Sequence, residues 1–198
     1  MAFPEFEPGR HRVLFFSRGR GRGHAMQDMT IARHLRELND NVEIRFVSYG
    51  SGADTFDRAG EHHIDLDFPD RNPILDTLVA AGRLIGWLNP DLVVAHEEFI
   101  ALPAAKIFQK PTVLLTDWFA DETKPTMSTI PFADRILFLD EQGMFEEPEA
   151  AKGKVEYVGP VVRKLRYTRG DRIRAREELQ IAADAFLLLV LPGTSREE

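Results

Sequence analysis

Short apolar runs alternate with helical patterns over the first 160 residues, and this alternation constrains the fold more than any other feature. The runs predict strands over 12–17, 42–48, 63–68, 91–95, 112–116, 135–139 and 154–158. Helices are predicted at 24–39, 52–60, 73–88 and 97–109, with weaker patterns at 126–132 and 141–150. Such alternation is typical of parallel strands joined by right-handed crossovers. We therefore expect an α/β fold with a doubly wound, Rossmann-like parallel sheet.

The turn after the first predicted strand contains glycines at positions 19, 21 and 23, and His24 follows them. A glycine-rich turn that leads into a helix presents backbone amides to an anion or a polar substrate. The spacing differs from the dinucleotide-binding fingerprint, because the third glycine comes one residue early. The second strand ends in Ser48-Tyr49-Gly50, which supplies no carboxylate for a ribose hydroxyl. The pattern argues against NAD.

Polar residues also follow other predicted strands. Ligands of doubly wound sheets bind beyond the carboxyl ends of the strands, so the candidates are the glycine turn, His96-Glu97-Glu98 and Asp117. Each has a purely structural alternative. His24 could be bonded to a loop carbonyl, the two glutamates could be stabilised by a helix dipole, and Asp117 could cap a turn. The arginines of the glycine turn could contact an anionic substrate or simply be solvated.

Composition restricts the partners and the compartment. A net charge of −7 argues against nucleic acid as the main partner. The absence of cysteine excludes disulfides and thiolate metal sites and fits a cytoplasmic protein. The adjacent His62-His63 make a poor metal site, so no metal is expected. The acidic start of the chain is unlike a signal peptide, and no apolar run approaches the roughly 20 residues needed to cross a bilayer.

The pattern changes after residue 160. A basic, polar stretch leads into a helical pattern at 171–180, and the apolar run 186–191 then precedes Pro192-Gly193-Thr194-Ser195. We expect 1–160 to be a complete first domain, and 161–198 to be a linker plus the opening strand of a second domain. The basic cluster between 163 and 176 is interpreted as a solvated linker and helix face, with attraction to the inner membrane surface as the alternative.

Six motifs, in order along the chain, resemble the N-terminal half of a GT-B glycosyltransferase. The resemblance is closest to glycosyltransferase family 28, the group of the peptidoglycan N-acetylglucosaminyltransferases. The motifs are Gly21-Arg22-Gly23-His24 and the segments 89–94, 110–114, 132–137, 155–163 and 189–195. The glycine turn is richer in arginine than is usual in that family, and the family's membrane-docking apolar patch has no clear counterpart here.

The resemblance implies inverting transfer of a sugar from a nucleotide-diphosphate sugar to an acceptor hydroxyl, without a further cofactor. The acceptor would be a glycan, a lipid-linked molecule or a small molecule. His24 would be the general base, since an imidazole with an ordinary pKa of about 6.5 suits proton removal near neutral pH. Either Glu97 or Glu98 would orient it, and Glu97 is counted with His24 as catalytic. Acceptor binding would fall to Gly21, Arg22, Gly23, His96, Glu98 and Asp117. Donor binding would involve Gly193, Thr194 and Ser195.

Other functions are compatible with the same residues. The chain could be a non-catalytic module that binds a nucleotide or phosphate, or one subunit of a two-subunit transferase. A UDP-sugar 2-epimerase ranks lower, because the carboxylates expected for it at strand ends are not convincingly placed. If this is a GT-B fragment, we expect no activity from it alone, and we expect its apolar run 186–191 to promote self-association.

Overall fold

The computed structural model describes residues 6–68, 74–119, 125–162 and 167–190. The chain divides into two compact units, Met1–Val162 and Arg163–Glu198. The assignment of 161–198 to a linker and a second domain stays a prediction.

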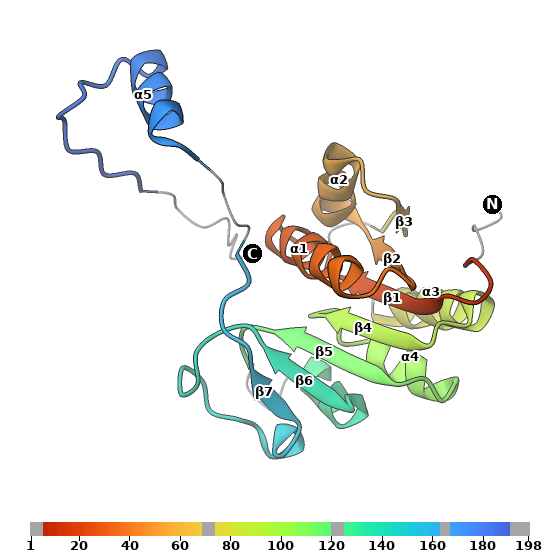
Figure 1. Cartoon of the computed structure of the whole chain (residues 1–198). Helices are drawn as coiled ribbons and strands as arrows, with labels where there is room; N and C mark the ends of the chain where they lie inside the picture. Colours follow the sequence, from red (N-terminus) through yellow and green to blue (C-terminus); the bar gives the residue numbers. More distant parts are fainter. Residues whose placement is uncertain (1–5, 69–73, 120–124, 163–166, 191–198) are drawn as a thin grey trace. The chain divides into compact units, whose positions relative to one another are not determined.

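In the described part of the first unit, seven parallel strands form one sheet in the order β3-β2-β1-β4-β5-β6-β7 (Figure 1). The strands are β1 (His11–Ser17), β2 (Val42–Ser48), β3 (His63–Asp65), β4 (Leu92–His96), β5 (Thr112–Thr116), β6 (Arg135–Phe138) and β7 (Val155–Tyr157). Each neighbouring pair is parallel. This confirms the predicted α/β, Rossmann-like fold, with strand boundaries close to those expected from the apolar runs.

The helices of this unit are α1 (Gly23–Leu38), α2 (Gly50–Ala59), α3 (Ile74–Leu88) and α4 (Ala101–Ile107), with 3-10 turns η1 (Pro125–Phe132) and η2 (Glu149–Ala151). Two helix predictions are wrong in part. The helix expected at 141–150 is replaced by turns and η2, because Gly143 has a φ of +90° and Pro148 interrupts the pattern. The helix expected from residue 97 begins at Ala101, since Glu97 has a left-handed φ of +51°.

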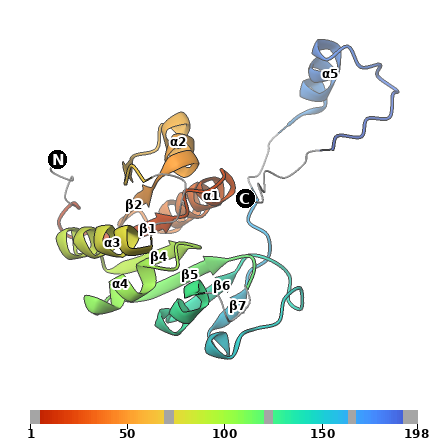
Figure 2. The same cartoon turned by 180° about the vertical axis from the view of Figure 1, so that it is seen from behind.

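Hydrophobic cores lie on both faces of the sheet, because successive side chains of a strand point to opposite faces. Val13 and Phe15 of β1 pack with residues of α1 and α2. Leu14 and Phe16, one position along, pack with residues of α3, α4 and η1. Figures 1 and 2 show α1 and α2 over one face and α3 and α4 over the other.

The strand order reverses between β1 and β4. From β1 the chain winds outward to β3, and then returns to place β4 on the other side of β1, where Ser17 is level with His96. In open α/β sheets this reversal separates the loops that follow the two strands, and ligands bind in the crevice between them. The glycine turn after β1 and the residues after β4 therefore flank the position where a ligand is expected.

The second unit contains α5 (Arg169–Glu178), whose N-terminus is capped by reciprocal hydrogen bonds between Thr168 and Asp171. Residues 186–190, where a buried strand was predicted, are exposed and have no regular secondary structure. The prediction is wrong for these residues, because a strand needs a hydrogen-bonded neighbour and no described strand pairs with them. Across the described ranges of both units, no helix is long and apolar enough to cross a membrane.

Candidate functional site

The glycine turn between β1 and α1 is fixed against the start of α2. The carbonyl oxygen of Gly19 accepts hydrogen bonds from the Gly52 amide at 3.1 Å and from the Ser51 hydroxyl at 2.8 Å. A side chain on Gly19 would lie 2.3 Å from the carbonyl oxygen of Tyr49, so only glycine fits there. Gly21, with a φ of +72°, and Gly23 have open space where a Cβ would be. The turn is thus packed at its base and open at its tip.

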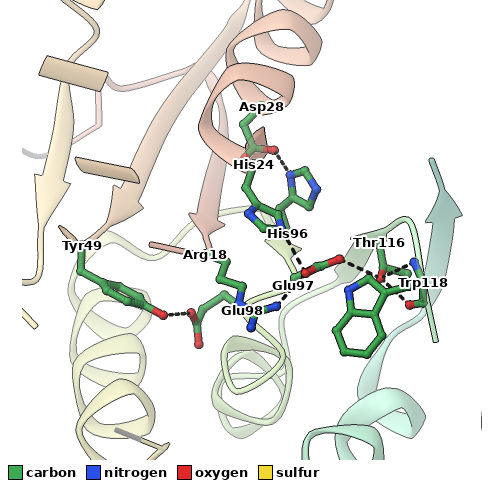
Figure 3. Close-up of polar contacts among 9 residues, drawn as sticks. All are labelled: Arg18, His24, Asp28, Tyr49, His96, Glu97, Glu98, Thr116 and Trp118. Atoms are coloured by element: carbon green, nitrogen blue, oxygen red, sulfur yellow. Dashed lines mark hydrogen bonds and ion pairs between the residues drawn. The ribbon is translucent and has the colours of Figure 1, made fainter. Parts of the chain in front are cut away.

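His24, the second residue of α1, meets a carboxylate from β4. Its Nε2 lies 3.0 Å from Oε2 of Glu97 (Figure 3). The partner seen here is therefore the Glu97 carboxylate and not the loop carbonyl of the structural alternative. The His24 side chain is 19% exposed and that of Glu97 is 3% exposed. The Nδ1 atom of His24 is buried and has no hydrogen-bond partner. Of the two glutamates that could pair with His24, the structure brings Glu97 to it.

Glu97 lies at the centre of the site. Its Oε2 also accepts a hydrogen bond from Nη1 of Arg18 at 2.8 Å, and its Oε1 is 3.4 Å from the hydroxyl of Thr116. Burial alone would raise the pKa of Glu97, but the contacts with His24 and Arg18 outweigh it and lower the pKa to about 2. Glu97 is therefore an ionised carboxylate near neutral pH. Its left-handed backbone places it on the turn after β4, before α4 starts.

Asp117 follows β5, the strand next to β4. Its pKa is raised by burial and by the negative charge of Glu97. Two carboxylates thus lie at the ends of adjacent strands, and their pKa values are moved in opposite directions. Pairs of acids with separated pKa values are suited to acid–base chemistry.

His96, predicted to bind the acceptor, is 1% exposed and packs against the ring of His24. As the last residue of β4 it points to the same face of the sheet as Val94, toward α1. There its Nδ1 is 2.7 Å from Oδ1 of Asp28, and the side chains are 1% and 0% exposed. Burial would lower the pKa of His96, but the charge and hydrogen bond of Asp28 reverse this and raise it. The rings of His24 and His96 are edge to face, with centroids 4.7 Å apart.

Glu98, predicted to bind the acceptor, is buried against Tyr49. Its Oε2 accepts a hydrogen bond from the Tyr49 hydroxyl at 3.1 Å, and both residues are buried. Burial raises the pKa of Glu98 to about 7. Arg22 is exposed on the glycine turn, where it can meet a ligand. The predicted donor residues Gly193, Thr194 and Ser195 lie outside the described residues.

The sequence analysis missed Asp28, Tyr49, Arg18 and Thr116. A signal existed for Asp28, because it stands four residues after His24 and so shares its face of α1. Tyr49 directly follows β2, a position that the rule about strand ends already marks. Within the described ranges, no cluster of three or more His, Cys, Asp or Glu residues could hold a metal ion.

No family model matches the chain, and no curated protein matches it in sequence. Solved structures do share its fold. MurG from Acinetobacter baumannii has a TM-score of 0.57 at 12% identity over 77% of this chain and 46% of that one. A glycosyltransferase from Rickettsia africae ESF-5 has a TM-score of 0.58 at 12% identity, covering 89% and 51%. A UDP-GlcNAc 2-epimerase from Neisseria meningitidis bound to UDP-GlcNAc has a TM-score of 0.52 at 14% identity, covering 65% and 40%.

The chain spans about half or less of the length of these structures. At such identities the likeness concerns the fold. The chain has the α/β, Rossmann-like architecture of GT-B domains, which glycosyltransferases and UDP-GlcNAc 2-epimerases share.

Proposed function

We propose that this chain is the acceptor-binding half of an inverting glycosyltransferase of the GT-B type, with His24 as the general base. The observation that carries the proposal is the contact of His24 with the ionised Glu97 beside the point where the strand order reverses. That crevice is where doubly wound sheets bind ligands. The solved glycosyltransferases of the same fold support the choice of reaction.

In the proposed reaction, an acceptor hydroxyl enters between the glycine turn and Glu97. His24 removes the hydroxyl proton while the oxygen attacks the anomeric carbon of a nucleotide-diphosphate sugar. The bond from that carbon to the diphosphate oxygen breaks, and the leaving diphosphate keeps the electron pair. The new bond forms on the opposite face, so the configuration is inverted. Glu97 stabilises the imidazolium that forms, since it is already ionised and lies 3.0 Å from the ring.

The remaining roles follow from position. Gly21, Gly23 and Arg22, which are open to solvent at the tip of the turn, would contact the acceptor, and Asp117 would contact it from β5. Gly193, Thr194 and Ser195 would begin the donor site. The protein would act in the cytoplasm, free or at the membrane surface.

The test is a transfer assay on the natural protein at its full length, with a panel of nucleotide sugars. We expect His24→Ala to lower kcat by about 10²–10⁴-fold, the usual effect of losing a general base. His34→Ala is the matched control, since His34 is an exposed residue of the same helix. Turnover close to wild type in His24→Ala would remove His24 from the mechanism. The 198-residue chain alone is expected to be inactive.

A second candidate is a UDP-sugar 2-epimerase, and the carboxylate pair of Glu97 and Asp117 favours it. Glu97 directly follows β4 and Asp117 directly follows the adjacent strand β5. The sequence alone did not show that two acids lie at neighbouring strand ends. Epimerisation at a carbon breaks a C–H bond and lets solvent hydrogen enter the sugar. The same assay in deuterated water separates the functions, because an epimerase incorporates deuterium without an acceptor and a transferase gives a glycoside. A binding module gives neither product.

A further inference from the structure

Arg18 and His24 contact the same oxygen of Glu97. Nη1 of Arg18 lies 2.8 Å from Oε2, and Nε2 of His24 lies 3.0 Å from it (Figure 3). Glu97 is ionised near neutral pH, and a carboxylate oxygen can only accept, so both nitrogens donate to it. The neutral His24 ring therefore has its one proton on Nε2 and its lone pair on Nδ1. A second proton, on Nδ1, makes the ring a cation.

The charges of these three side chains balance only while His24 is neutral. The Glu97 side chain is 3% exposed, and a carboxylate so deeply buried needs a cation beside it. Arg18 supplies that cation, because a guanidinium stays charged throughout the pH range in which proteins fold. With Arg18 in place, a second proton on His24 adds a positive charge to a group whose net charge is already zero. Without Arg18, that proton would instead compensate the charge of Glu97.

The backbone fixes Arg18 and Glu97 beside each other. Arg18 directly follows β1, and its amide donates to the carbonyl oxygen of His96 at 3.1 Å. Glu97 directly follows β4, and its amide donates to the carbonyl oxygen of Leu115 at 3.1 Å. Glu97 also pairs with Ser17 in an isolated β-bridge. The ion pair is therefore held by the ends of the two strands that flank the expected ligand crevice.

We propose that Arg18 is a positioning residue that acts through Glu97: by compensating the charge of the shared carboxylate, it keeps His24 free of a second proton near neutral pH. The catalytic meaning of this role rests on the proposed function, in which His24 is the general base; the effect on the proton of His24 does not. A base must be unprotonated to take a proton from a hydroxyl. Arg18 would thus set the lowest pH at which His24 can act.

The other charged groups around this cluster do not supply the same compensation. Four further titratable side chains surround it: His96, Asp28, Asp117 and Glu98. Of these four, only His96 can be a cation, and its Nδ1 lies 2.7 Å from the carboxylate of Asp28, which balances its charge. Arg20 and Arg22 are exposed at the tip of the glycine turn, where solvent screens their charges. Removing Arg18 should therefore have an effect of its own.

The test is a pH titration of the histidine side chains in the 198-residue chain, followed by nitrogen-15 NMR. Neutral His24 should have its proton on Nε2 in wild type. The amide of Arg18→Gln can still donate to Glu97 but has no charge, and we expect the midpoint of the His24 titration to rise by about one pH unit or more, which is about tenfold in proton affinity. Arg18→Lys retains the charge and should keep the midpoint near that of wild type. Arg33→Gln, which removes an exposed charge from α1, should leave it unchanged.

A proton on Nδ1 of neutral wild-type His24 would overturn the proposal, and this measurement needs no variant. A midpoint that stays the same or falls in Arg18→Gln would also overturn it.

The kinetic readout uses the natural full-length protein. In Arg18→Gln, the low-pH limb of kcat against pH should move upward by the same amount as the NMR midpoint, and kcat should recover at high pH. The two proposals fail separately. A raised NMR midpoint supports the role of Arg18 even if no transfer is found, whereas an active transferase whose pH profile does not move contradicts this role and leaves His24 as the base.

Discussion

Glu97 and Glu98 are adjacent and both buried, yet their pKa values move in opposite directions. The pKa of Glu97 falls to about 2 because His24 and Arg18 outweigh the effect of burial. Glu98 is bonded to the neutral hydroxyl of Tyr49, and the effect of burial dominates, so its pKa rises to about 7. Cationic partners therefore decide which of the two stays charged. One turn of chain thus supplies an anion to the site and, below about pH 7, a neutral acid to the core.

This difference predicts how stability depends on pH. Glu98 keeps its proton in the folded state up to a pKa of about 7, while the unfolded value is 4.5. Between these values the folded state binds more protons, so the free energy of unfolding falls as pH rises, by up to about 3 kcal/mol. The lowered pKa of Glu97 has the opposite effect on the free energy of unfolding. The stability that ionised Glu97 gives to the fold is lost only as pH falls from about 4.5 toward 2.

The measurement is urea unfolding at about pH 5 and pH 8. Glu98→Gln keeps an acceptor for the Tyr49 hydroxyl, and we expect it to lose less stability over this range than wild type. Glu146→Gln, an exposed change, should follow the wild-type curve. Equal losses in Glu98→Gln and wild type would show that Glu98 does not titrate as described.

At the scale of elements, most of the fold could be predicted from the sequence, and the errors have local causes. Buried parallel strands are short and apolar, so their positions could be predicted from the sequence. The start of α4 could not be predicted, because a helical pattern does not show that Glu97 has a left-handed backbone. His24 and Glu97 were found from strand ends. The roles of His96 and Glu98 were not, because they depend on the facing residues Asp28 and Tyr49 of other elements.

The packing of the glycine turn against α2 can be tested by a matched pair of substitutions. In Gly19→Ala, the new Cβ would lie 2.3 Å from the Tyr49 carbonyl oxygen, and backbone cannot move aside easily. We expect a loss of about 1–3 kcal/mol in the free energy of unfolding. Gly23→Ala adds a methyl group into open space at the first position of α1, where alanine favours the helix, so its stability should be equal or higher. Urea unfolding of both variants is the measurement, and equal stabilities would show that the turn is not constrained at Gly19.

At the scale of the whole molecule, the two units differ in how much of their apolar side chains is exposed to solvent. In the first unit such residues form cores on both faces of the sheet. In the second, the consecutive residues Phe186, Leu187, Leu188, Leu189 and Val190 are all more than half exposed. The sequence pattern of a buried strand could be recognised there, but its partners could not. Strand pairing is made with distant or separate chain segments, which a local pattern does not identify.

An exposed apolar run with unpaired backbone groups favours pairing with another copy. We therefore expect the 198-residue chain to self-associate with rising concentration, through residues 186–190. The double substitution Phe186→Asp, Leu188→Asp should prevent this, because charges in a strand edge oppose pairing. The matched control is Tyr167→Asp, Leu179→Asp, which adds the same charge at exposed apolar residues of the same unit. Light scattering over a concentration series is the measurement. Association that persists in the first variant, or a wild-type chain that stays monomeric at high concentration, would contradict the role of this segment.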